Sequence, residues 1–201
     1  MYIQCGQEMS AEDIRDSLLR SDKSPRPEVD GQVYRKAAVL VPLVCWQNQW
    51  HLLFTRRSTR VQDHKGQVSF PGGAIESTDI SPTFSALREA KEEIGLLPDD
   101  VAVLGVMRDF PTITGFLITP VVGIVPWPYE LTLAEEEVSR AFIIPIEWLS
   151  NYAHHEEVDM TFPNGWKERV IHFHLYDDEK LWGITARITL EFLNIIGVNK
   201  E

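Results

Sequence analysis

One stretch of the chain, from Gly72 to Leu96, begins as a glycine turn and continues as a helix crowded with carboxylates. Apolar residues gather on one side of this helix, so that side must pack against a core. Three acidic residues, Glu89, Glu92 and Glu93, sit at i, i+3 and i+4 and therefore share another face. Like charges at this spacing repel by a few tenths of a kcal/mol per pair. A divalent cation that prefers oxygen ligands would turn that repulsion into binding.

Before and after this helix in the sequence, strands and helices are expected in no regular alternation. This mixture predicts one α+β domain, an α/β/α sandwich with a mixed sheet between helices. Residues 1–30 are expected to form an N-terminal helix and a linker, and residues 31–201 the domain. The expected strands span 35–46, 50–55, 66–70, 101–107, 116–125 and 141–146, with a terminal hairpin at 160–165 and 169–175. Short helices are expected at 10–20 and 147–151, and Thr185 is expected to cap a last helix over 186–196.

Composition limits the possible functions. The formal net charge is −11, which argues against a broad nucleic-acid-binding surface. No run of 18 apolar residues occurs, so no membrane-spanning helix is expected. Cys5 and Cys45 are too few for a disulfide framework, and Cys45 lies in an apolar run typical of a buried small side chain. A reducing compartment and a cytoplasmic location are the expectation.

The stretch from Gly73 to Leu96 resembles the Nudix box, Gly-x5-Glu-x7-Arg-Glu-U-x-Glu-Glu-x-Gly-U, where U is aliphatic. Residues 88–96, Arg-Glu-Ala-Lys-Glu-Glu-Ile-Gly-Leu, match its second half position by position. The first half departs from the pattern. Asp79 replaces the glutamate, and eight residues instead of seven separate it from Arg88. The resemblance implies a Nudix fold and a hydrolase of diphosphate linkages.

Two further segments narrow the resemblance. Residues 53–58 and 64–73, which precede the box, are similar to the corresponding segment in the coenzyme A pyrophosphatase branch of the Nudix hydrolases. This branch is also similar in its longer box loop and in residues 182–186, Trp-Gly-Ile-Thr-Ala. The resemblance implies hydrolysis of coenzyme A or its derivatives to 3′,5′-ADP and 4′-phosphopantetheine.

The resemblance also implies roles for the carboxylates. Glu89, Glu92 and Glu93 would hold Mg²⁺ or Mn²⁺, and Arg88 would orient the loop or a glutamate through an ion pair. Glu137 resembles a downstream acidic residue that approaches the metals in many Nudix enzymes. It is a candidate general base, although residues 135–137 are equally compatible with a solvated loop. Glu89 is an alternative holder of the attacking water, and Glu92 also belongs to the catalytic set.

The substrate-binding candidates lie just before the box. They comprise basic residues, which form the only basic cluster in an acidic chain and could bind phosphate. They also include two glycines, which let the backbone approach phosphate closely. These candidates are Arg56, Arg57, Arg60, His64, Gly72 and Gly73. A solvated charged loop is the alternative for the basic residues. His154, His155, His172 and His174 lack a partner cluster and indicate a structural or surface role.

The expected partner is therefore a small nucleoside diphosphate derivative such as coenzyme A, with no nucleic acid and no membrane. Two alternatives remain open on the sequence. The same chemistry could act on ADP-ribose, a dinucleotide or a nucleoside triphosphate, and a non-catalytic Nudix module could sense a nucleotide. The sequence also leaves open whether aromatic residues serve a homodimer or a substrate pocket.

Overall fold

The computed structural model describes residues 4–5, 9–21, 33–60, 65–161, 165 and 167–198. Its main sheet has the strand order β10-β4-β3-β9-β7, and three short strands, β5, β6 and β8, pair with β4, β3 and β9. The β3–β9 pair is parallel and the other pairs are antiparallel, which confirms the predicted mixed sheet. The strands are β1 (Gln4–Cys5), β2 (Met9–Ser10), β3 (Arg35–Trp46), β4 (Gln49–Arg57), β5 (Val68–Ser69), β6 (Gly72–Ala74), β7 (Ala102–Val106), β8 (Phe110–Pro111), β9 (Phe116–Val125), β10 (Val138–Pro145), β11 (His155–Thr161) and β12 (Lys167–Phe173). The helices are α1 (Ala11–Ser21), α2 (Pro82–Ile94), α3 (Ile146–Leu149) and α4 (Gly183–Ile195), with short 3₁₀ turns at Pro98–Asp100 and Tyr152–His154.

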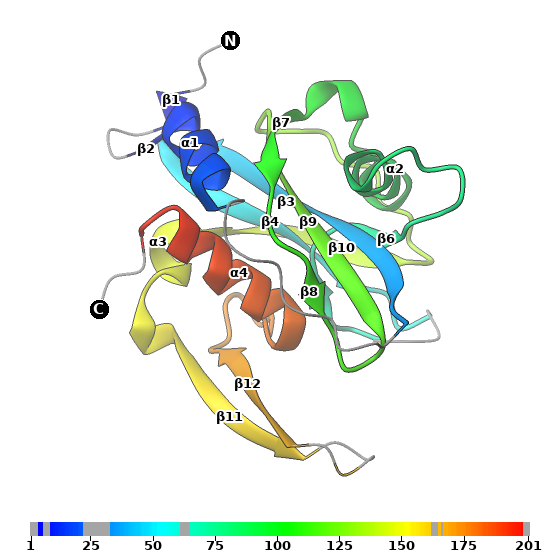
Figure 1. Ribbon diagram of the computed structural model, residues 1–201. Helices are drawn as coiled ribbons and strands as arrows, with labels where there is room; N and C mark the ends of the chain where they lie inside the picture. Colours follow the sequence, from blue (N-terminus) through cyan, green and yellow to red (C-terminus); the bar gives the residue numbers. More distant parts are fainter. Residues whose placement is uncertain are drawn as a thin grey trace.

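Helices cover both faces of the sheet, so the α/β/α sandwich is confirmed (Figure 1). Two apolar clusters fill the two faces. One packs α2 against even-numbered residues of β3, such as Ala38 and Leu40. The other packs α1 and α4 against odd-numbered residues, such as Val41 and Leu43. Because successive side chains of a strand point to opposite faces, the continuous apolar run of β3 supplies both clusters.

Helix α2 begins and ends where its sequence requires. The Ser81 hydroxyl accepts a hydrogen bond from Phe84 N at 3.1 Å, and Pro82 occupies the first helical position. Gly95 ends the helix in the left-handed conformation, with φ of 71°. Ser81 is therefore the N-cap of α2.

Two local predictions are wrong. The sequence predicts a turn at Asn48 and Gln49 before the strand at 50–55, but the structure forms this turn from Gln47 and Asn48, both with positive φ, so β4 begins at Gln49. Such paired left-handed residues match the twist of a two-residue hairpin. Thr185 does not cap the last helix, because α4 begins earlier, after Trp182. Trp182 pairs with His172 across an isolated bridge, which fixes where the extended backbone ends and the helix starts.

The cysteines form a disulfide, Cys5 to Cys45, which corrects the expectation of a free, buried Cys45. The bond joins β1 to the end of β3, 40 residues along the chain. It also removes the observation on which the expected reducing compartment rested. The sequence missed the pair because two cysteines far apart in the chain carry no spacing signal.

The N-terminal helix packs on the main body. Leu18 is buried, and its Cβ lies 3.3 Å from the position that a Cβ on Gly105 would take. The predicted boundary between residues 30 and 31 lies outside the described residues. None of the helices in the described parts of the chain is long and apolar enough to cross a membrane.

Candidate active site

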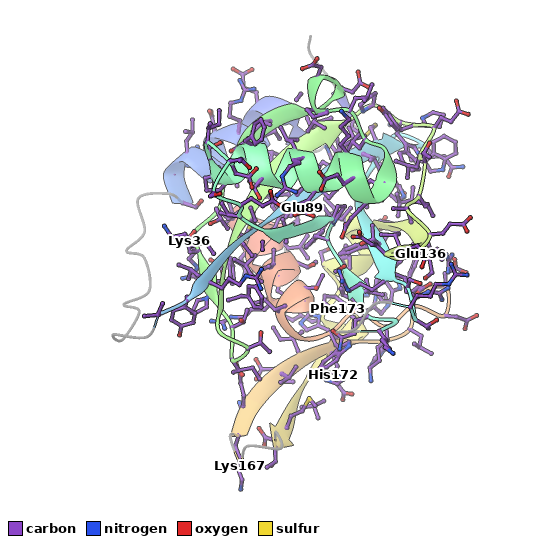
Figure 2. The ribbon with its side chains drawn as sticks, turned by 90° about the vertical axis from the view of Figure 1, so that its right-hand side faces the viewer. Lys36, Glu89, Glu136, Lys167, His172 and Phe173 are labelled. Atoms are coloured by element: carbon purple, nitrogen blue, oxygen red, sulfur yellow. A yellow bond between two sulfur atoms is a disulfide. The ribbon has the colours of Figure 1, made fainter. Side chains whose placement is uncertain are left out.

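The three glutamates of α2 differ sharply in burial. Glu93 is only 3% exposed and faces the sheet, where its Oε2 accepts a hydrogen bond from Gly72 N at 3.2 Å. The Glu89 side chain is 17% exposed, and the Glu92 side chain is 58% exposed. Figure 2 shows Glu89 beneath α2. Two carboxylates therefore point into the body of the protein beside β6, and the third lies at its surface.

The glycine pair of β6 is shaped around this arrangement. A Cβ on Gly73 would lie 2.6 Å from the Glu89 carboxyl carbon. A Cβ on Gly72 would lie 2.4 Å from the carbonyl oxygen of Ala38 on β3. Only glycine allows α2, β6 and β3 to approach one another this closely.

Arg88 connects the loop before α2 to its glutamates. Its Nε and Nη2 donate to the two carboxylate oxygens of Asp79, each at 3.0 Å. Its Nη1 donates to Glu89 at 3.0 Å and to Glu92 at 2.9 Å. The expected ion pair with a glutamate is thus present. Because protein groups surround this guanidinium, it orients the loop and the carboxylates.

The electrostatics follow from these contacts. The Arg88 guanidinium lowers the pKa of Asp79 to about 2. Burial raises the pKa of Glu93 to about 8, against the opposing effects of the Gly72 N–H and the Arg57 charge. Burial raises the pKa of Glu89 too, against the opposing effect of Arg88. A bound cation would favour the charged forms of both glutamates.

Glu137 stands opposite α2, in the turn that precedes β10. Its backbone oxygen accepts a hydrogen bond from Ser58 N at 2.7 Å, which fixes the turn against the end of β4. Its charge contributes to the raised pKa values of Glu89 and Glu93, so its carboxylate lies within electrostatic reach of both. Its side chain is exposed.

The predicted basic residues separate into different environments. Arg57 Nη1 lies 3.8 Å from Glu93 Oε1, at the carboxylates themselves. Arg56 donates to Ser139 Oγ at 3.0 Å and to the buried Glu179 at 3.2 Å. Arg60 pairs with the exposed Glu136 at 2.7 Å. His64 lies outside the described residues.

The comparisons with known proteins identify the family. A family model described as the NUDIX domain matches residues 34–174. The chain belongs to the Nudix family. Its similar relatives include two proteins named uncharacterized Nudix hydrolase NudL, from Citrobacter koseri and Escherichia coli K12, which are 39% and 38% identical over 185 residues. These alignments cover 91% of this chain and 95% of each relative. A solved MutT/nudix family protein from Enterococcus faecalis is 16% identical and shares the fold, with a TM-score of 0.54 over 90% of this chain and 68% of that chain.

The chain is therefore a Nudix hydrolase, an enzyme that acts on phosphorus-containing anhydrides. Nudix hydrolases generally need divalent ions such as Mg²⁺ or Mn²⁺, and the donor set here fits them. Every candidate ligand is a carboxylate oxygen, and two of these carboxylates are buried with raised pKa values. Within the described residues, no three His, Cys, Asp or Glu side chains are already gathered closely enough to hold an ion. Water and substrate phosphate would complete the coordination of an ion bound by Glu89 and Glu93.

The Nudix loop accommodates its extra residue between two fixed points. Asp79 is held by Arg88, and Ser81 caps α2. Ile80 lies between them, and 86% of this residue is exposed. The longer loop therefore leaves the carboxylates of the Nudix helix in register.

Other residues near this Nudix site were missed in the sequence. Glu179 is 3% exposed and pairs with both Arg56 and Arg140, but no motif marks it. A pocket of about 360 Å³ beside the N-terminus of α2 was missed as well.

Proposed function

We propose that this enzyme hydrolyses the diphosphate linkage of coenzyme A or its derivatives to 3′,5′-ADP and 4′-phosphopantetheine, or to its acyl form. The contact between Arg57 and Glu93 supports this proposal most directly. It brings the arginine-rich segment, on which the resemblance to the coenzyme A branch depends, to the buried carboxylates. A guanidinium there can pair with phosphate oxygens through its forked N–H groups.

The residues have distinct tasks in the proposed reaction. Glu89 and Glu93 would hold the divalent ion, with Glu92 as a third ligand from the surface. Bound there, such an ion screens the diphosphate charge, lowers the pKa of water and stabilises the leaving phosphate. Arg88 keeps Glu89 and the loop in place, and the glycine backbone of β6 approaches the phosphates. Arg57 binds an anionic oxygen, which reduces repulsion between substrate and carboxylates.

Two residues are candidates for the base that takes the proton from the attacking water. Glu137 is exposed and stands opposite α2, whereas Glu89 lies directly against the glycine turn. We favour Glu137, because Glu89 is already engaged by Arg88 and is also a proposed metal ligand. Glu137→Gln should lower kcat and flatten the acidic limb of the pH–rate profile, whereas a Glu89 base predicts an unchanged limb.

A direct assay tests the substrate. Purified enzyme would be incubated with coenzyme A and Mg²⁺, then Mn²⁺, and the products identified by mass spectrometry. We expect 3′,5′-ADP and 4′-phosphopantetheine in equal amounts. Intact coenzyme A together with cleavage of ADP-ribose, a dinucleotide or a nucleoside triphosphate in the same panel would falsify the substrate assignment.

A non-catalytic nucleotide sensor is the rival from another class. Three mutually repelling carboxylates argue against it, because a site that no longer binds metal has no physical reason to keep them together. A metal titration separates the two. The enzyme releases product only with Mg²⁺ or Mn²⁺, whereas a sensor binds its ligand equally well without metal and releases none.

A further inference from the structure

A pocket lies on the same side of the sheet as α2, and its lining contains no arginine. The pocket of about 360 Å³ is formed between the N-terminus of α2 and the strands β3, β7 and β9. Its volume is within the range of small-molecule sites. Its lining residues are Lys36, Ile75, Pro82, Val106, Met107, Asp109, Leu117 and Thr119.

The pocket has an aliphatic interior and a few polar groups. Ile75, Val106 and Leu117 provide branched apolar walls. Met107 also borders the pocket, but its side chain is buried in the apolar cluster beneath α1 and α4, on the other face of the sheet. The Thr119 hydroxyl donates to the Asp109 carboxylate at 2.7 Å, which fixes the orientation of this acceptor. A ligand with alkyl branches and N–H or O–H groups satisfies both parts of this lining.

The charge of the pocket excludes a strongly anionic occupant. Its lining contains one cation, Lys36, and one anion, Asp109, so the formal charges cancel. Arg88 is neutralised by Asp79, Glu89 and Glu92, whereas Arg57 contacts Glu93 beside Gly72 and Arg60 pairs with Glu136. Figure 2 shows Lys36 to one side of Glu89 and Glu136, the partner of Arg60, to the other.

The pocket adjoins the carboxylates through β6. Gly73, which contacts Glu89, is paired with Ala38 on β3. Lys36 lies two residues before Ala38 on β3, about 7 Å from it along the strand. The Lys36 carbonyl oxygen accepts a hydrogen bond from Ile75 N at 3.0 Å. A diphosphate at Glu89 can therefore extend one arm into the pocket and the other towards the arginines.

We propose that this pocket binds the pantetheine arm of the substrate, an inference that rests on the proposed function. This arm is uncharged, and the carbon next to its phosphate-bearing methylene carries two methyl groups, followed by a hydroxyl and two amides. The methyl groups pack on Ile75 and Val106, and Asp109 accepts from the hydroxyl or an amide N–H. The 3′-phosphoadenosine arm then lies at the arginine side, where its charge is matched.

A substitution in the lining provides a direct probe of this pocket. The chain contains four methionines, and Leu117→Met adds a fifth in the pocket lining at nearly the same side-chain volume. Methyl-¹³C-methionine labelling gives one resonance for each, and the resonance that the wild type lacks reports on position 117. Titration of the Leu117→Met variant with 4′-phosphopantetheine in Mg²⁺ should shift this added resonance in a saturable manner. Titration with 3′,5′-ADP should leave it unchanged, and Met160 on β11 serves as an internal reference.

Filling the pocket tests the assignment independently. Leu117→Trp should weaken 4′-phosphopantetheine binding about tenfold or more and raise the KM for coenzyme A similarly, with little change in kcat. Binding of 3′,5′-ADP should not change. Ile75→Trp fills the pocket from another wall if Leu117→Trp fails to fold. Leu19→Trp, at a 60% exposed position on α1, is the matched control and should bind both products normally.

Each outcome has a separate meaning. A shift of the added methyl resonance with 3′,5′-ADP but not with 4′-phosphopantetheine, or with neither, overturns the pocket assignment even where coenzyme A is cleaved. Conversely, a shift of this resonance with 4′-phosphopantetheine in a protein that leaves coenzyme A intact sustains the pocket and overturns the proposed function.

Discussion

At the scale of single residues, Glu93 places a titratable carboxyl in a buried position. Its carboxylate is 3% exposed and is met by one backbone N–H and by Arg57 at 3.8 Å. Burial raises its pKa to about 8 in the absence of a cation. Burial disfavours the charged form of this carboxyl. The proposed role of Glu93 in binding a metal ion explains why a glutamate occupies this position.

We expect Glu93→Gln to lower kcat by about a thousandfold, because the variant loses a charged ligand at the centre of the site. The change is nearly isosteric and replaces a carboxyl whose charged form is disfavoured by burial, so the melting temperature should not fall. Activity assays and thermal denaturation measure the two effects. Glu12→Gln, an exposed substitution on α1, is the control and should alter neither. Full activity of Glu93→Gln would remove this glutamate from the ligand set.

Gly73→Ala tests the packing of the glycine turn. The added methyl would lie 2.6 Å from the Glu89 carboxyl carbon, so either the carboxylate or β6 must move. We expect at least a tenfold loss of kcat, roughly as for other displaced catalytic groups, and about 1–3 kcal/mol lower stability. Gly197→Ala is the control for a methyl added in open space, because no atom lies within 4 Å of its added Cβ; unlike Gly73, Gly197 has positive φ. That control should lose stability through its backbone alone and keep its activity.

At the scale of elements, the sequence predicted best where the controlling contacts are local. The bounds of α2 follow from Ser81, Pro82 and Gly95, all within or beside the helix. The position of the Arg56 side chain does not follow from neighbouring residues, because its partner Glu179 lies 123 residues away in the chain. Likewise, the pocket is assembled from strands whose pairing only the fold reveals. The candidate metal-binding residues could thus be predicted from the sequence. The spatial arrangement of the arginines and the pocket around them could not.

The hairpin β11–β12 extends from the body of the protein (Figure 1). Its base packs among aromatic rings. The His155 ring lies 5.1 Å from Phe173, and the His172 ring lies 5.6 Å from Trp182. The His154 ring stacks on Trp148 at 4.6 Å. These contacts give His154, His155 and His172 packing roles in the structure.

Acid should loosen this hairpin. Burial lowers the pKa of both His155 and His172 below the ordinary value of 6.5. The folded protein therefore binds these protons less readily than the unfolded chain, and stability falls as the pH drops below about 6.5 towards the folded-state pKa values. Melting temperatures of the wild type and of His155→Phe/His172→Phe, measured between pH 8 and 5, test this. The double variant should show the smaller acid-induced decrease, and an equal decrease would contradict the assignment.

At the scale of the whole molecule, the disulfide ties the N-terminal segment to the central strand. The closed loop of about 40 residues should contribute about 4 kcal/mol to the free energy of unfolding. Cys45 lies six residues along β3 from Val39, the partner of Gly72, a separation of about 20 Å. Cys5→Ser/Cys45→Ser should therefore lower the urea midpoint without changing kcat at temperatures where the variant is folded. A similar change on reduction of the wild type is the control, and an unchanged midpoint would show that the bond does not constrain the unfolded chain.

The exposed Ile80, between Asp79 and Ser81, has a practical consequence. Because both cysteines of the chain are bonded to each other, Ile80→Cys would provide the single free thiol of the oxidised protein. A fluorophore attached there would report on the loop at the mouth of the site while Arg88 and the serine cap keep the helix fixed. The position is suited to following substrate arrival and product departure in real time.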